Sequence, residues 1–176
     1  WADYIYLDTD ERRRFAQVSH EYLIEQLQFQ NEASGTSMNL NFNHPVKELI
    51  WTGGVTSGTP SSTTGPSQPL TVATGVTYLL KLNGHDRFAA RNFRYFTRAQ
   101  VWQHHTGHGS VGVADSIAVY SFALKPEEHQ PSGTCNFSRI DNAQLILGAA
   151  QALHVYAINY NVLRIMSGMG GLAYSN

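Results

Sequence analysis

The densest group of potential metal ligands in this sequence is the histidine-rich segment HHTGH, which contains His104, His105 and His108. Zinc sites combine histidines with cysteines or carboxylates at spacings that a helix or a strand sets. Gly107 and Gly109 disfavour a helix here, and no carboxylate follows before Asp115. Polar loop histidines are therefore the preferred interpretation, and the sequence predicts neither a metal site nor a cofactor.

Other motifs that can support catalysis lack the context that their chemistry requires. Gly107, Gly109 and Gly112 match G-x-G-x-x-G, but a phosphate site needs this motif between a strand and a helix, and a strand is expected after it. The sequence contains neither a G-x-S-x-G nucleophile turn nor a C-x-x-C pair. We therefore predict no catalytic residues and no enzymatic activity.

Two features near position 130 have both a functional and a structural interpretation. Glu127, Glu128 and His129 are suited to acid–base chemistry, but they lie in a segment bounded by prolines, so a solvated turn or a subunit contact is preferred. Asn136 begins the N-glycosylation sequon Asn-Phe-Ser. Apolar residues alternate around Asn136 and no secretory signal is visible, so glycosylation is not expected there.

Short strands separated by turn residues dominate the chain. Met38, Leu40 and Phe42 alternate with asparagines, which is the period of a half-buried strand. Tyr120–Asp141 is predicted to form two core strands joined by a proline-bounded turn. The remaining strands are expected at 4–7, 22–30, 46–51, 77–82, 117–124, 134–147 and 153–165.

Two segments are predicted to be helical and one to be an irregular loop. Asp8 and Glu11 have capping-box spacing at the start of a helix that extends to Gln17. A second helix is expected over Phe88–Gln103, although its aromatic residues fit no single period. Residues 55–75 are a low-complexity segment rich in Ser, Thr, Gly and Pro, either a tolerated insertion or an exposed surface decoration.

These elements favour an all-β fold, namely an antiparallel, eight-stranded jelly-roll sandwich with one or two short helices. Strand spacing alone does not separate a jelly roll from an immunoglobulin-like sandwich. The Cys…Trp…Cys pattern of true immunoglobulin domains is absent, because Cys135 is the only cysteine. We expect residues 1–176 to form a single domain that contains the 55–75 loop.

Composition limits the possible partners. Only 14% of the residues are charged, which suits either extensive protein–protein contact or simply a β protein with a polar, uncharged surface. The 12 Lys and Arg residues are balanced by 13 Asp and Glu, and Arg12–Arg14 is the only run of basic residues, which argues against direct nucleic-acid binding. No run approaches the roughly 18 apolar residues of a membrane helix. Because the chain begins at Trp1, we expect it to be a fragment of a longer protein.

Five collinear segments resemble the major capsid proteins of nucleocytoplasmic large DNA viruses, the group of iridoviruses, chloroviruses and African swine fever virus. The segments are Asp10–Gln28, Leu40–Trp51, Leu80–Phe88, Tyr120–Asp141 and Tyr156–Asn176. Residues 55–75 have no counterpart in this resemblance and look like a variable insertion.

The resemblance implies a structural role in a virion shell. In that family each chain carries two jelly rolls, and three chains form a pseudo-hexagonal trimeric capsomer that tiles an icosahedral capsid around an internal membrane. This chain resembles the C-terminal jelly roll. The implied partners are the N-terminal jelly roll of the same chain, further copies in the homotrimer, neighbouring capsomers and minor capsid proteins, with assembly in the host cytoplasm.

Two alternatives remain open at this stage. A glycan-binding, lectin-like β-sandwich would account for the aromatic content and the long polar loops. A cupin-like metalloenzyme would account for the segment HHTGH, although the His-x-His pattern of cupins is missing.

Overall fold

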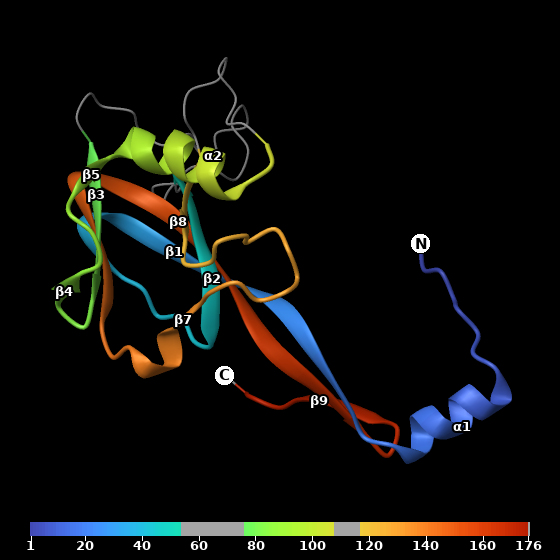
Figure 1. The fold of residues 1–176 in the computed structure, drawn as a ribbon. Helices are drawn as coiled ribbons and strands as arrows, with labels where there is room; N and C mark the ends of the chain where they lie inside the picture. The colour runs from blue at the N-terminus through green and yellow to red at the C-terminus, as the bar shows by residue number, and fades with distance from the viewer. Residues whose placement is uncertain (54–75, 108–116, 176) are drawn as a thin grey trace. The chain divides into compact units, whose positions relative to one another are not determined.

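The computed structural model describes residues 1–53, 76–107 and 117–175 (Figure 1). The chain divides into two compact units, one formed by Gln26–Asn159 and the other by Trp1–Glu25 together with Tyr160–Asn176. The predicted 55–75 loop lies outside the described residues, and the single domain expected over 1–176 stays a prediction.

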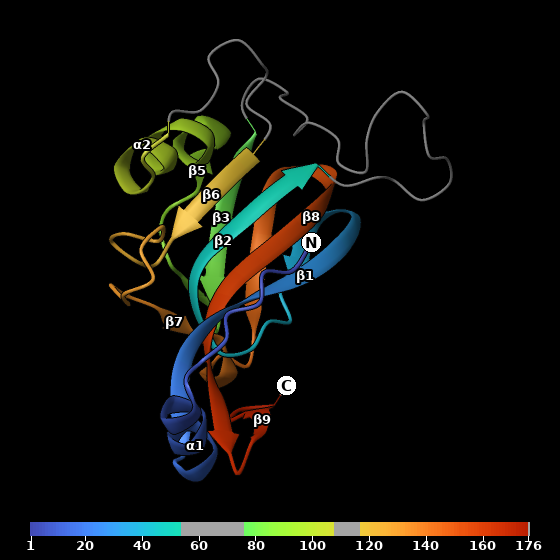
Figure 2. The same cartoon turned by 90° about the vertical axis from the view of Figure 1, so that its right-hand side faces the viewer.

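Antiparallel strands dominate the described residues, which confirms the predicted all-β class. The central order is β4-β3-β8-β2-β6, while β1 and β9 pair with β8, β5 pairs with β3, and β7 pairs with β2. Figure 2 shows β8, β2 and β6 side by side. The strands are β1 (His20–Asn39), β2 (Pro45–Gly53), β3 (Thr77–Leu82), β4 (His85–Asp86), β5 (Arg91–Asn92), β6 (Ile117–Ser121), β7 (Cys135–Asn136), β8 (Ala143–Met166) and β9 (Met169–Leu172).

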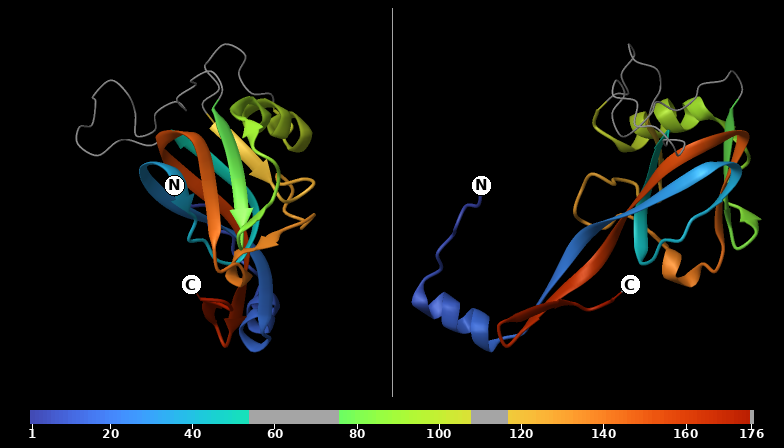
Figure 3. Two further views of the ribbon diagram at one scale, coloured as in Figure 1. Left: turned by 90° about the vertical axis from the view of Figure 1, so that its left-hand side faces the viewer. Right: turned by 180° about the vertical axis from the view of Figure 1, so that it is seen from behind.

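Strand β8 pairs with two different strands of the sheet along its length. Its first residues, Ala143–Leu147, pair with β3, whereas Leu153–Asn159 pair with β2. Between them the strand bends back (Figure 3), and Gly148 lies so close to β3 that an added Cβ would be 2.7 Å from Thr77 Oγ1. The sequence predicted two strands, at 134–147 and 153–165. From Ala143 onward the structure has one continuous strand, which bends between the part that pairs with β3 and the part that pairs with β2.

The core of the larger unit is built around Trp51 of β2. This side chain is buried, and its ring centroid lies 5.3 Å from that of Phe96 and 5.4 Å from that of Tyr78. Its backbone pairs with Val155 of β8 on one side and Ala118 of β6 on the other. Aromatic burial on this scale makes a large contribution to the hydrophobic stability of the unit.

Two glutamines of β1 replace part of a regular strand ladder. The Gln28 amide donates to Asn43 O at 2.7 Å and accepts from Asn43 N at 3.0 Å. The Gln30 amide donates to Asn39 O at 2.6 Å and accepts from Asn41 N at 2.9 Å. The predicted alternation of buried and exposed residues over 38–43 is confirmed. Strand β1 itself ends at Asn39, because beyond it the glutamine side chains, and not a neighbouring strand, bond to the backbone.

The smaller unit contains helix α1 (Thr9–Gln17) and the β8–β9 hairpin. The predicted capping box is confirmed, because the Asp8 side chain accepts from the backbone N–H of Glu11 and Asp8 N donates to Glu11 Oε2 at 3.3 Å. The predicted strand at 4–7 is wrong: these residues form no strand, since none of the described strands pairs with them.

The helix predicted over Phe88–Gln103 begins later and changes its pitch. Strand β5 occupies Arg91–Asn92, and the helical part contains the π-helical turn η1 (Tyr95–Ala99) followed by α2 (Gln100–His104). Phe88 instead packs on Tyr120, with ring centroids 4.8 Å apart. In this segment the aromatic side chains lie where they pack in the core, and the helix departs from a regular α-helical repeat to allow this.

The segment Tyr120–Asp141 contains only part of the predicted pair of core strands. Strand β6 ends at Ser121, and the next strand, β7, has two residues and is followed by the 3₁₀ turn η2 (Phe137–Arg139). Both strands pair with β2 rather than with each other, β6 over Glu48–Thr52 and β7 at Pro45–Val46. The intervening loop leaves β2 beside Glu48 and rejoins it at Val46, so β7 continues the pairing of β6 toward the start of β2.

Gly133, which closes this loop, has a backbone conformation that only glycine adopts without strain. Its φ is +146°, and an added Cβ would lie 2.7 Å from Phe122 O. We expect Gly133→Ala to destabilise the fold by about 1–3 kcal/mol, measured by chemical denaturation. Gly107→Ala is the matched control, because a Cβ there meets no atom within 4 Å. Equal stability of the two variants would contradict this account.

Candidate functional site

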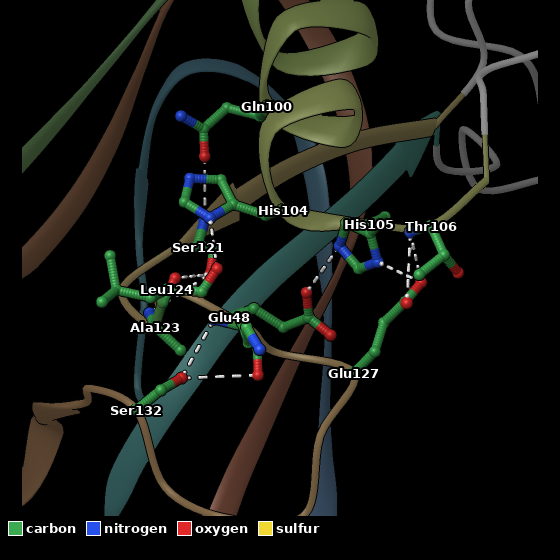
Figure 4. A network of polar contacts seen from close by, with 11 residues as sticks. Glu48, Gln100, His104, His105, Thr106, Ser121, Ala123, Leu124, Glu127 and Ser132 are labelled. Carbon is green, nitrogen blue, oxygen red and sulfur yellow. Dashed lines mark hydrogen bonds and ion pairs between the residues drawn. The ribbon is translucent and has the colours of Figure 1, made fainter.

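The histidines that the sequence singled out lie at the C-terminal end of α2. His104 is the last residue of this helix, and His105 follows it with extended backbone angles. The His104 Nδ1 atom lies 3.1 Å from the backbone oxygen of Leu124 (Figure 4). Because a carbonyl oxygen only accepts, Nδ1 carries the proton in this contact. His108 lies outside the described residues, so the structure does not test its grouping with His104 and His105.

The imidazole of His105 lies between two carboxylates from different parts of the fold (Figure 4). Its Nε2 is 3.1 Å from Oε2 of Glu48 on β2, and its Nδ1 is 3.2 Å from Oε1 of Glu127 in the loop after β6. The Nε2 contact has the distance of an ion pair but not the alignment of a hydrogen bond. A carboxylate oxygen only accepts, so His105 Nδ1 donates in the contact with Glu127.

The two carboxylates have different environments. Burial raises the pKa of the Glu48 carboxyl, and the facing charges of His105 and Lys47 partly oppose this effect. Glu127 is exposed, and hydrogen bonds from Thr106, whose backbone N lies 3.1 Å from each carboxylate oxygen, hold the pKa of this carboxyl below its usual range. Glu48 is therefore the group for which an ionised state is costly, and His105 is its nearest compensating partner.

A histidine between two carboxylates with opposite pKa shifts is a recognisable acid–base arrangement, and such chemistry would also need a pocket beside it in the part of the chain described. The core gap found there is lined only by Leu40, Leu49, Trp51, Leu80, Phe88, Tyr120, Leu145 and Val155, so the cluster does not reach it. We interpret Glu48, His105 and Glu127 as a latch that fastens the end of α2 to β2 and to the following loop.

Metal binding finds no support in the geometry of His104 and His105. Their rings face different partners, and across residues 1–53, 76–107 and 117–175 no group of three or more His, Cys, Asp or Glu side chains is arranged to hold a metal ion. The expected absence of a metal and of a cofactor stays a prediction.

Among the residues that the structure describes, no helix is long and apolar enough to cross a membrane.

The loop residues near position 130 are divided between different environments. Glu127 contacts His105 and Thr106, which directly follow α2, whereas Glu128 Oε1 pairs with Lys125 Nζ at 3.0 Å on the surface. Asn136 is exposed, and its side-chain oxygen accepts from Ser138 N at 3.1 Å at the start of η2. The contact of Glu127 with His105 within the same chain was not predicted from the sequence. The absence of glycosylation at Asn136 stays a prediction.

Glu48 is the residue of this cluster that sequence reasoning overlooked entirely. Its signal is the charged pair Lys47–Glu48 inside the apolar run of β2, where both side chains are buried. Charged residues are seldom fully buried without partners, so a pair in this position predicts a compensating group elsewhere in the chain. The identity of that group, His105, depends on the tertiary fold.

The smaller unit presents an apolar surface of a different kind. Helix α1 buries none of its residues, and large apolar side chains are exposed along the N-terminal segment and at the β8–β9 hairpin. The most exposed of them are Trp1, Tyr4, Ile5, Tyr6, Met169 and Tyr174. The exposed apolar side chains of the hairpin mark a surface suited to contact with other protein.

An antiparallel sheet that curls through a strand shared between its two halves is typical of a jelly-roll protein. Residues 11–171 match the family described as large eukaryotic DNA virus major capsid protein. The chain belongs to this family.

Individual relatives agree with this assignment. The chain is 52% identical to the major capsid protein of Pyramimonas orientalis virus and 42% identical to that of Paramecium bursaria Chlorella virus 1, in both cases over the whole of this chain. It covers 48% and 53% of these two proteins, so it spans about half the length of the curated relatives it matches. A solved structure, titled as a quasi-atomic model of the PBCV-1 virus capsid, superimposes with a TM-score of 0.78 at 39% identity, over 98% of this chain and 56% of the other.

Proposed function

We propose that this chain is half of a structural capsid subunit that builds a virion shell and has no catalytic role. The observation that carries the proposal is the family match over residues 11–171, accompanied by structural similarity to a chlorovirus capsid protein over 98% of the chain. The interpretation of the Glu48–His105–Glu127 cluster as a latch is consistent with this role, because a shell subunit requires rigidity rather than turnover.

The partners follow from the same proposal. The chain forms the C-terminal jelly roll of a double jelly-roll subunit, and its N-terminal counterpart lies in the other half of the protein. Three subunits form a pseudo-hexagonal capsomer, which contacts neighbouring capsomers and minor capsid proteins around an internal membrane after assembly in the host cytoplasm. The exposed apolar side chains of the smaller unit support contacts with these partners rather than with nucleic acid.

The proposal predicts a trimer for the full-length protein. Light scattering coupled to size-exclusion chromatography should give the mass of three chains over a range of concentrations, and electron micrographs of the same fraction should show a pseudo-hexagonal outline. Self-association buries the apolar side chains that the isolated unit exposes, which is the physical reason for the expected mass. A stable monomer at the highest concentration would overturn the proposal.

A further inference from the structure

Residues 39–43 have hydrogen-bonding backbone groups on two sides. Leu40 N donates to Ala143 O at 2.8 Å, so one side of the segment faces the start of β8. Backbone groups of adjacent residues in an extended chain point to opposite sides, so those of Asn41 and Asn43 face away from β8. Neither of these two residues belongs to a described strand. The segment therefore has a second side, here called the 39–43 edge, which would be an open strand edge if nothing bonded to it.

Two side-chain amides bond to this edge. The amide of a glutamine carries a carbonyl acceptor and N–H donors, the same groups as a backbone peptide unit. Gln28 bonds to the backbone N and O of Asn43. Gln30 accepts from Asn41 N and donates to Asn39 O. Side chains two residues apart project from the same face of a strand, and the edge groups repeat with the same spacing, so the two amides stand where the backbone of a neighbouring strand would lie.

Further hydrogen bonds hold both amides in place. Gln28 Nε2 also donates to Oδ1 of Asn159, a buried side chain of β8, at 3.0 Å. Gln30 Nε2 also donates to Oε1 of Glu32. Each amide nitrogen thus has partners for its N–H groups, which leaves the amide oxygen to face the backbone N–H groups of the 39–43 edge. The closure of this edge is therefore organised within the larger unit and does not require another chain.

A glutamine also bonds to the last strand of the sheet. Strand β6 ends the order β4-β3-β8-β2-β6. Ser121 N of this strand donates to Gln100 Oε1 at 3.1 Å, and Gln100 Nε2 donates to Tyr95 OH at 2.9 Å. Glutamine side chains therefore bond to strand edges at two separate places in the larger unit.

The sequence of the 39–43 edge lacks the usual protection against pairing with another chain. Exposed strand edges commonly carry lysine, proline or a bulge, each of which hinders a second strand from pairing. Residues 37–43, with the sequence SMNLNFN, contain no charged residue and no proline. Segments of about six or seven residues with low charge and no proline are prone to pair with other strands when their edge is open. Gln28 and Gln30 therefore supply a closure that the segment itself does not encode.

We propose that Gln28 and Gln30 keep the 39–43 edge closed and so prevent it from pairing with the same edge of a second copy. A second copy is the partner that this edge fits, because two identical edges can pair antiparallel and satisfy each other's backbone groups. The proposal goes beyond the shell-building role, since it concerns a contact between copies that assembly must avoid.

Removal of both amides in the full-length protein tests the closure. Gln28→Leu with Gln30→Leu keeps side chains of similar size but leaves the backbone N–H groups of the edge without their acceptors. Hydrogen–deuterium exchange followed by mass spectrometry should show peptides that cover 39–43 exchanging roughly tenfold faster than in the wild type. Gln144→Leu is the matched control, because the Gln144 amide donates to the Asn39 side chain at 3.0 Å and not to its backbone. The control should exchange like the wild type.

The opened edge should also cause copies to associate wrongly. Light scattering should show the double variant forming large oligomers severalfold faster than the wild type at the same concentration. Asn41→Lys, added to the two changes, places a charge on the opened edge and should return oligomer formation to the wild-type rate while exchange stays fast. This combination separates edge pairing from a general loss of stability, because the lysine does not restore the lost hydrogen bonds.

Three results would overturn the proposal. Unchanged exchange in the double variant would show that the glutamines do not close the edge. Fast exchange without faster oligomer formation, or oligomers that Asn41→Lys does not suppress, would exclude protection against a second copy. If the double variant fails to fold, Gln30→Leu alone keeps the Gln28 contacts and should still speed the exchange of the peptide that contains Asn41. Unchanged exchange in that single variant would equally overturn the proposal.

Discussion

Trp51→Ala should destabilise the protein by about 3–5 kcal/mol, the largest effect expected for a single substitution in this chain. The Trp51 side chain is 1% exposed and contacts the rings of Tyr78 and Phe96. Alanine would leave a cavity where β2, β3 and the helical segment meet. Neighbouring aromatic rings cannot fill such a cavity without leaving their own packed positions.

Denaturant titration of the full-length protein, followed by circular dichroism, measures this effect. Trp102→Ala is the matched control, because it removes the same side chain from a position that is 78% exposed. The control should differ from the wild type by less than about 0.5 kcal/mol. Similar losses of stability in the two variants would show that Trp51 does not anchor the core as described.

His105→Ala is expected to cost roughly 3 kcal/mol at neutral pH, because it leaves the buried Glu48 carboxylate without its nearest partner. The Glu48 side chain is only 5% exposed, and His105 Nε2 lies 3.1 Å from it. His85→Ala is the control, since His85 is an exposed histidine of the short strand β4. Equal stability of these two variants at neutral pH would refute the latch.

The cost of His105→Ala should also depend on pH in a defined direction. Burial raises the folded-state pKa of Glu48 above its unfolded value, so the folded state favours the protonated carboxyl. The penalty for an ionised Glu48 is therefore present above the folded pKa and relieved as the pH falls through it. We expect the deficit relative to the wild type to shrink on acidification toward the carboxyl range. The double variant Glu48→Gln/His105→Ala should regain stability at neutral pH and lose this pH dependence.

The all-β class and the family of this protein were predicted from the sequence alone, the family through its resemblance to known capsid proteins. Features that depend on neighbouring residues were predicted correctly, including the capping box of Asp8 and Glu11 and the alternation of burial at Met38, Leu40 and Phe42. Capping and period-two burial are properties of a few consecutive residues, so they can be read without knowledge of the rest of the chain. The resemblance to capsid proteins then indicated how these local elements are arranged, namely as a jelly roll.

The candidate site was only partly visible in the sequence. His104, His105 and Glu127 were singled out, but as loop histidines and as a solvated turn or subunit contact. Glu48 was overlooked, although the charged pair at Lys47–Glu48 interrupts an apolar strand. Positions 48, 105 and 127 come together only when β2, α2 and the loop after β6 pack, and no local pattern encodes that meeting.

The positions at which a strand exchanges one neighbouring strand for another are visible only in the tertiary structure. Strand β8 pairs with β3 and then with β2 around Gly148, and the Gln28 and Gln30 amides take over from backbone pairing beyond Asn39. The apolar residues 4–7 look like a strand in the sequence but have no strand partner in the fold. A strand requires a hydrogen-bonded partner, and for β2, β6 and the two halves of β8 that partner lies far away in the chain, so its register and its end depend on the complete fold.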